Sequence, residues 1–159
     1  MVNALVVILM GSKSDVEHSE KIADACKGYG IETVLRIGSA HKTPEHMLKI
    51  LREYEAEARP RVYITVAGRS NALSGFTDGA VSAPVIACPP ASDVFGGADV
   101  FSSLRMPSGI APALVLEPAN AALLAAKILG LANPDIRAAV IKSQMQAAEK
   151  IIQDDQVLQ

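Results

Sequence analysis

The chain lacks several features that would place it in other protein classes. It has no Trp, and aromatic residues make up only 4% of its 159 residues, so Ala, Val, Ile and Leu must fill the interior. Its 15 Lys and Arg are balanced by 17 Asp and Glu, for a net charge of −2. This balance excludes the basic stripe that nucleic-acid-binding proteins need. We therefore expect a small-metabolite ligand and no nucleic-acid partner.

Cysteines and long apolar runs are also scarce. Cys26 and Cys88 stand alone, without the spacing of a disulfide framework or zinc site, and we expect both to be reduced and buried. The three His residues lack metal-ligand spacing, and HExxH is absent, so we predict no metal. No stretch reaches about 18 consecutive apolar residues, and no basic leader precedes the first apolar run. These features favour a cytoplasmic protein that does not bind membranes.

Short apolar runs alternate with segments of helical periodicity. Strands are expected at 4–10, 32–37, 62–67, 85–88 and 113–116, and helices at 16–30, 44–56, 72–79, 99–104, 119–131 and 133–155. This alternation predicts a three-layer α/β sandwich with a five-stranded, parallel, flavodoxin-like sheet and right-handed crossovers. The length fits one domain, 1–159, with its α/β core at 4–131.

The last two predicted helices have more apolar surface than one sheet can cover. Segment 119–131 is apolar nearly all round, with Lys127 its only charge, so we expect the sheet and other subunits to bury it. The C-terminal helix, 133–155, follows a sheet that is already complete, and we expect it to pack on a neighbouring chain of a homo-oligomer. Its apolar stripe consists of Ile136, Val140, Ala147 and Ile151.

Four polar segments follow predicted strands. They read GSKSD, GSAHKT, AGRSN and CPPASD. Because the carboxyl ends of parallel strands lie at one edge of the sheet, a single ligand can touch several of these segments. This edge is the predicted binding site.

The first segment has the composition of a phosphate and ribose site. Ser12 and Ser14 supply hydroxyl donors beside the unpaired N–H groups of a helix start, and Asp15 suits a ribose diol. Helix capping explains the same residues equally well, because Ser14 and Glu17 have the spacing of a capping box. The two roles are compatible. The sequence contains neither a GxxxxGK[ST] nor a GxGxxG motif.

The second segment carries the candidate catalytic residues, His41 and Lys42. They lie between a strand that ends at Gly38 and a helix that begins at Thr43-Pro44, where Thr can cap and Pro suits the first helical position. An imidazole suits proton transfer near neutral pH, and an ammonium group suits an anionic substrate. The alternative is a structural or solvated loop His.

The other charged or polar candidates are more ambiguous. His18 and His46 fall within helices, and we expect both at the surface. Arg69 and Arg105 could each bind an anion or form a salt bridge between subunits, and we favour structural roles. We interpret Asp93 and Asp99 as solvated turn residues rather than substrate contacts, and Asn120 as a residue that positions a loop.

Four motifs together resemble the aminoimidazole ribonucleotide carboxylase and carboxyaminoimidazole ribonucleotide mutase family of purine biosynthesis. They are GSxSD at 11–15, SAH followed by Lys or Arg and Thr-Pro at 39–44, MPxG at 106–109, and NAALLAA at 120–126. The resemblance covers residues 4–131. It implies a single flavodoxin-like domain, an octamer, and active sites at subunit junctions.

The resemblance also distinguishes the two branches of the family. The mutase branch usually carries Arg at the position of Lys42, and Gly-Gly-Ala-Ala-His-Leu where this chain has Gly68 to Leu73. Lys42, Gly68 to Asn71, Cys88 to Pro90 and Ser102 to Arg105 are similar to the branch that uses CO2 directly. The resemblance therefore implies a carboxylase (a carboxy-lyase) that acts on aminoimidazole ribonucleotide and CO2 and needs no ATP, biotin, metal or other cofactor.

Specific roles follow as hypotheses. His41 would move the proton, and Lys42 would stabilise the new carboxylate or hold the phosphate. Backbone N–H groups near Gly68 and Ser70 would also stabilise the carboxylate. The predicted substrate-binding residues are Ser12, Ser14, Asp15, Ser39, Lys42, Gly68, Ser70 and Asn71.

Three alternatives stay open. The first is a mutase that acts on N5-carboxyaminoimidazole ribonucleotide. The second is a flavodoxin-like binding protein for FMN or another phosphorylated metabolite, although the chain has few aromatic side chains to stack on a flavin. The third is a structural or regulatory oligomer that has lost activity.

Overall fold

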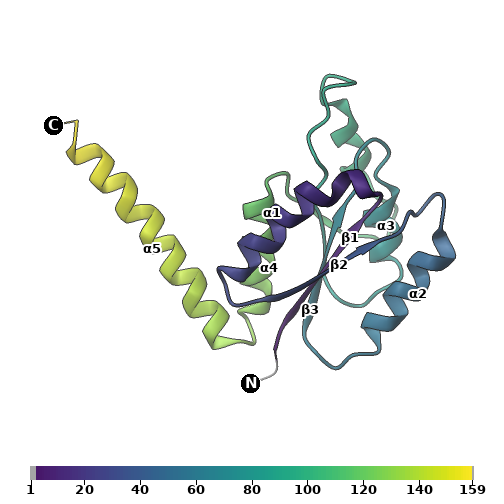
Figure 1. Cartoon of the computed structure of the whole chain (residues 1–159), viewed down its shortest axis with the longest axis horizontal. Helices are drawn as coiled ribbons and strands as arrows, with labels where there is room; N and C mark the ends of the chain where they lie inside the picture. Colours follow the sequence, from purple (N-terminus) through teal and green to yellow (C-terminus); the bar gives the residue numbers. More distant parts are fainter. Residues whose placement is uncertain (1–2, 159) are drawn as a thin grey trace.

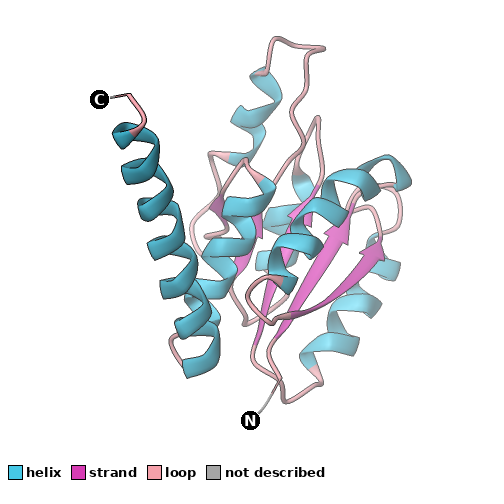
Figure 2. Ribbon diagram, turned by 60° about the vertical axis from the view of Figure 1, so that its left-hand side comes forward, coloured by secondary structure: helices cyan, strands magenta, loops and turns pink. Residues whose placement is uncertain are grey.

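The computed structural model describes residues 3–158, so the first two residues and the last lie outside it. Within this range five parallel strands form one sheet between two helical layers (Figures 1 and 2). The strand order is β2-β1-β3-β4-β5, the flavodoxin-like order. This confirms the predicted fold. The strands are β1 (Leu5–Met10), β2 (Glu32–Ile37), β3 (Arg61–Val66), β4 (Val85–Ala87) and β5 (Ala113–Leu114).

The helices also follow the predicted order. They are the 3₁₀ turn η1 (Lys13–Asp15), α1 (Val16–Lys27), α2 (Pro44–Glu55), α3 (Ala72–Asp78), the 3₁₀ segment η2 (Ala98–Ser103), α4 (Pro118–Leu129) and α5 (Pro134–Gln156). Helices α1 and α4 cover one face of the sheet, and α2 and α3 cover the other. The largest boundary difference in the sheet is β5, which ends two residues earlier than predicted.

Strand β1 lies at the centre of the core. Val6 and Ile8 pack in the cluster that includes α1 and α4, while Leu5, Val7 and Leu9 pack in the cluster that includes α2 and α3. None of these five side chains is exposed. Burial on both faces explains why this strand is a continuous apolar run rather than an alternating one.

Two predictions about helix starts were wrong in detail. Glu17 does not form a capping box with Ser14, because its carboxylate pairs with Lys21 at 2.9 Å. The chain enters α1 through η1, so the box lies upstream, where the Ser12 N–H donates to Asp15 Oδ2 at 2.9 Å. At α2, Pro44 takes the first helical position as predicted, but the Thr43 hydroxyl bonds Ser39 rather than a helix N–H.

Helix α5 extends away from the body of the molecule (Figure 1). Of its predicted stripe, Ile136 and Val140 are buried, whereas Ala147 and Ile151 are exposed. Its start is well anchored, since the Asn133 side chain accepts from the N–H groups of the first turn. No helix within residues 3–158 has both the length and the apolar content to cross a membrane.

Glu55 at the end of α2 ties this helix to strand β3 and to the loop that contains Ser82. Its Oε1 accepts from the Tyr63 hydroxyl at 2.9 Å and from Arg61 at 3.2 Å, both on β3. Its Oε2 accepts from the backbone N–H and hydroxyl of Ser82, at 3.1 and 3.0 Å. Burial alone would raise the pKa of Glu55, but these donors lower it below the ordinary value of 4.5.

We predict that Glu55→Gln lowers the free energy of unfolding at neutral pH by about 1–3 kcal/mol. The folded-state pKa lies below the unfolded value, so the carboxylate stabilises the fold above about pH 4.5 and this contribution is lost as the pH falls. Urea unfolding should therefore show the gap between variant and wild type narrowing towards about pH 4. Glu20→Gln, at an exposed position on α1, is the control. A gap that is independent of pH would contradict the prediction.

Cys26 and Cys88 are free and buried, as predicted. Neither is exposed at all, and burial raises the pKa of both thiols to about 12. A thiol reagent needs an accessible thiolate. We therefore predict that the native chain does not react with a disulfide reagent at neutral pH, and that both thiols react once urea unfolds it. Fast reaction of either thiol in the native state would contradict this.

Candidate active site

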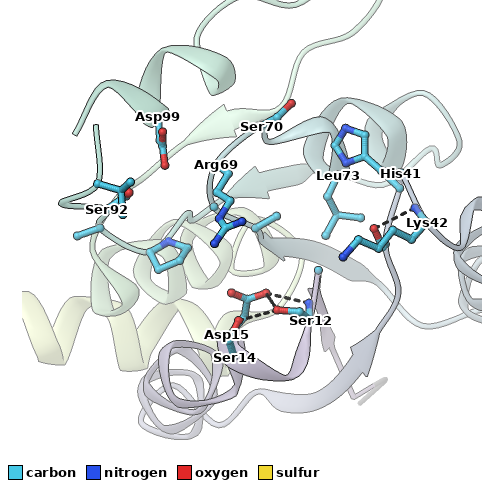
Figure 3. Close-up of a pocket in the computed structure, with 18 of the residues that line it drawn as sticks. Ser12, Ser14, Asp15, His41, Lys42, Arg69, Ser70, Leu73, Ser92 and Asp99 are labelled. Atoms are coloured by element: carbon cyan, nitrogen blue, oxygen red, sulfur yellow. Dashed lines mark hydrogen bonds between the residues drawn. The ribbon is translucent and has the colours of Figure 1, made fainter. Parts of the chain in front are cut away.

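A cavity of about 770 Å³ opens at the carboxyl ends of the strands (Figure 3). The loops that follow β1, β2, β3 and β4 all contribute to its wall, so the four polar segments meet as predicted. A cavity of this size can enclose a nucleotide. The predicted site residues that line it are Ser12, Ser14, Asp15, Ser39, His41, Lys42, Gly68 and Ser70.

The loop after β1 is a tight turn built by its own side chains. Asp15 Oδ2 accepts from both the N–H and the hydroxyl of Ser12, at 2.9 and 3.1 Å. The hydroxyls of Ser12 and Ser14 lie 2.6 Å apart. Asp15 is buried, but both Ser residues are exposed to the cavity. Capping and ligand binding are therefore compatible in this turn, as the sequence indicated.

The loop after β2 presents His41 and Lys42 from a similar turn. The Ser39 hydroxyl accepts from the Lys42 N–H at 3.2 Å, and the Ser39 carbonyl accepts from the Thr43 N–H at 2.9 Å. Both candidate catalytic side chains are exposed, and neither has a hydrogen-bond partner among residues 3–158. They are thus available to a ligand in the cavity.

The loop after β3 carries Arg69 in an unusual conformation. Its φ of 58° makes it the one non-glycine residue with positive φ in the described part of the chain. Its guanidinium points into the cavity, facing the same space as Lys42 and Ser12 (Figure 3). It forms no ion pair within residues 3–158, and a salt bridge to another subunit stays a prediction. Arg105 is exposed and does not line the cavity.

Asn71, a predicted substrate contact, does not line the cavity. It is only 4% exposed because it caps α3, where its Oδ1 accepts from the Ser74 N–H at 3.3 Å. Its amide nitrogen donates to the Ser103 hydroxyl at 2.8 Å. Both ends of the side chain are therefore used to hold the protein together, and in this structure the Asn71 side chain does not face the cavity.

The loop after β4 adds groups that sequence reasoning undervalued. Asp93 is exposed, as expected of a solvated turn residue. Asp99 is not, because its Oδ2 is enclosed and has no hydrogen-bond partner in the described part of the chain. Ser92 also lines the cavity and was not predicted. Its place in the CPPASD segment, directly after a strand, was the available signal.

His18 lines a second cavity of about 610 Å³ that shares Gly68, Arg69 and Pro90 with the first. It is half-buried rather than a surface residue as predicted, and its Nε2 lies 3.4 Å from Cys88 Sγ. Burial lowers the pKa of His18 below its ordinary value of 6.5. Burial thus favours the uncharged form of both side chains in this pair. His46 is exposed, as expected.

The cavity suits an anionic ligand rich in hydroxyl groups. Lys42 and Arg69 supply positive charge, the serine hydroxyls supply donors, and Asp15 supplies an acceptor. Within residues 3–158, no three His, Cys, Asp or Glu side chains are grouped so that they could hold a metal ion.

Comparison with known proteins agrees with this chemistry. Residues 5–150 match the family model described as AIR carboxylase. A phosphoribosylaminoimidazole carboxylase from Treponema denticola is 64% identical over 97% of this chain and 97% of its own. One from Archaeoglobus fulgidus is 57% identical over 96% of this chain and 83% of its own.

The match extends to longer proteins and to solved structures. A human bifunctional phosphoribosylaminoimidazole carboxylase/succinocarboxamide synthetase is 46% identical over 92% of this chain and 36% of its own length. The crystal structure of Treponema denticola PurE superposes with a TM-score of 0.97, at 61% identity and 99% coverage of both chains. The family match and these relatives identify the chain as a member of the AIR carboxylase family.

Proposed function

We propose that this chain carboxylates 5-aminoimidazole ribonucleotide with CO2, reversibly and without ATP, to 4-carboxy-5-aminoimidazole ribonucleotide in purine biosynthesis. One observation carries the proposal. In a member of this family, His41 and Lys42 stand with Ser12, Ser39 and Arg69 around one cavity of nucleotide size. Lys42 and Gly68 to Asn71 favour the branch that uses CO2 directly.

The phosphoribosyl part of the substrate would be held by the first two loops. The hydroxyl groups of Ser12 and Ser14 face the cavity. Ser39 accepts from the Lys42 N–H, which leaves its own hydroxyl proton for a ligand oxygen. Asp15 uses Oδ2 within the turn, which leaves its other carboxylate oxygen for a ribose hydroxyl. Lys42 adds a charge-assisted contact to the phosphate or the new carboxylate.

The reaction asks the protein mainly to position two reactants and to move one proton. The amino group makes the adjacent ring carbon an enamine-like nucleophile, which attacks the carbon of CO2 and forms a new carbon–carbon bond. That ring carbon then carries both hydrogen and carboxylate. His41 would remove the proton, the electron pair of the C–H bond would return to the ring, and aromaticity would be restored. Backbone N–H groups near Gly68 and Ser70 would stabilise the carboxylate.

We propose a cytoplasmic homo-oligomer, an octamer by family resemblance, built from single domains of residues 1–159. In it the C-terminal helix packs on a neighbouring chain. The support is the apolar side chains that α5 leaves outside the core, Ile141, Met145 and Ile152, which are 51%, 67% and 55% exposed. Burying them against another chain would remove that surface from water.

The decisive assay supplies aminoimidazole ribonucleotide and CO2 without ATP or added metal. We expect efficient formation of the carboxylated product, at CO2 levels that leave a mutase nearly idle. In a parallel reaction N5-carboxyaminoimidazole ribonucleotide is the sole substrate. Turnover only in the second reaction would assign the mutase activity. Turnover in neither would favour a binding protein, and a yellow protein would point to FMN.

His41→Asn tests the proton transfer. We expect kcat to fall by roughly 10²–10⁴ while nucleotide binding is nearly unchanged, since a positioned acid–base group contributes to rate rather than affinity. His46→Asn, on the exposed face of α2, is the matched control and should keep full activity. Normal turnover by His41→Asn would contradict the proposed mechanism.

A further inference from the structure

We propose that Ser102 is a positioning residue for this reaction. Its hydroxyl holds Arg69 in the left-handed conformation that directs the guanidinium into the cavity, where the guanidinium binds an oxyanion of the substrate or product. The identity of that ligand rests on the proposed function, whereas the contacts of Ser102 do not.

The conformation of Arg69 needs an external constraint. A φ of 58° brings Cβ close to the following carbonyl, so it is unfavourable for any residue other than glycine. A glycine at position 69 would adopt this φ freely, but it would place no charge in the cavity. A strained backbone and a cationic side chain thus occur together at a ligand cavity. This combination indicates that the backbone conformation is needed to place the Arg69 guanidinium in the cavity.

One hydroxyl group supplies the constraint. The single hydroxyl proton of Ser102 is shared between the carbonyl oxygens of Arg69 and Asp99, which lie 3.0 and 2.8 Å from Oγ. The same oxygen accepts from the N–H of Asn71 at 3.0 Å. Ser102 thus contacts the backbone on both sides of Ser70, 33 residues from the Arg69 carbonyl that it binds. These bonds fasten the loop after β3 to the segment η2.

The neighbouring residues reinforce the same attachment. The Asn71 side chain donates to the Ser103 hydroxyl at 2.8 Å, and this contact is buried. Ser102 is exposed, so its role does not depend on filling the core. The similarity of Gly68 to Asn71 and Ser102 to Arg105 to one branch of the family thereby gains a physical reason, since the two segments bind each other.

The guanidinium has a suitable ligand in the proposed reaction. Arg69 pairs with no carboxylate within residues 3–158 and shares the cavity with Lys42. The substrate carries one phosphate, and the product carries a phosphate and a carboxylate. Two cationic side chains therefore face up to two oxyanions. Arg binds either oxyanion through parallel N–H donors, provided that its backbone holds the guanidinium in place.

The test compares Ser102→Ala, Arg69→Ala and the double variant. We expect Arg69→Ala to weaken nucleotide binding by about 10- to 100-fold. Ser102→Ala should weaken binding of the affected nucleotide by about tenfold, and if Arg69 binds the phosphate the variant should raise KM with much less effect on kcat. The double variant should bind no worse than Arg69→Ala, since Ser102 acts through Arg69. Ser102→Thr keeps the hydroxyl and should restore binding. Ser108→Ala is the control, because this serine is exposed and lies outside the cavity.

Two ligands distinguish the oxyanions. If Arg69 binds the phosphate, both variants weaken aminoimidazole ribonucleotide and its carboxylated product equally. If Arg69 binds the carboxylate, only the product is weakened. Wild-type affinity of Ser102→Ala for both ligands, or losses that add in the double variant, would overturn the proposal.

A second measurement is independent of catalysis. Hydrogen exchange of the Asn71 amide should accelerate at least about tenfold in Ser102→Ala, because the variant removes its acceptor. Unchanged exchange would also overturn the proposal. If the wild-type chain binds neither nucleotide, the proposed function fails. The role of Ser102 is then still decided by the exchange of the Asn71 amide and by whether inorganic phosphate stabilises the wild type against unfolding more than it stabilises Ser102→Ala.

Discussion

The structure depends on the burial of β1 between parallel neighbours on both sides and helices on both faces. Its side chains are at most 3% exposed, and β2 and β3 pair with it in parallel along its whole length. Parallel pairing aligns the carboxyl ends of these strands, so the loops that leave them must emerge together. The active-site cavity is a direct consequence, because three polar loops start from the three adjacent strands β2, β1 and β3, and β4 adds a fourth.

The polar residues of these loops do two tasks at once. The Ser12 to Asp15 turn and the Ser39 to Lys42 turn are each closed by a hydroxyl or carboxylate side chain that also faces the cavity. A side chain that folds its own loop has already lost much of its conformational freedom before a ligand binds. This reduces the entropy lost on binding and favours a preformed site.

Local sequence patterns predicted the elements well but predicted polar contacts less well. The Ser14 and Glu17 spacing matched a capping box, yet η1 moved the start of the helical turn to Ser12. Asn71 was a predicted substrate contact, yet its side chain caps α3 and binds Ser103. His18 lies on an amphipathic helix, but its position near the end of α1 that meets the cavities buries half of it beside Cys88. Two of these differences depend on partners that are distant in the sequence, namely Ser103 for Asn71 and Cys88 for His18.

The sequence by itself determined the order and type of the elements, because apolar periodicity is a property of neighbouring residues. It also determined that the polar segments follow strands, and therefore that they share one edge of the sheet. Only the tertiary structure decided which side chains face the cavity. The bonds that hold the Asn71 side chain and the Arg69 carbonyl come from Ser103 and Ser102, which lie 32 and 33 residues away in the sequence. Such contacts exist only after the chain has packed, so no local pattern encodes them.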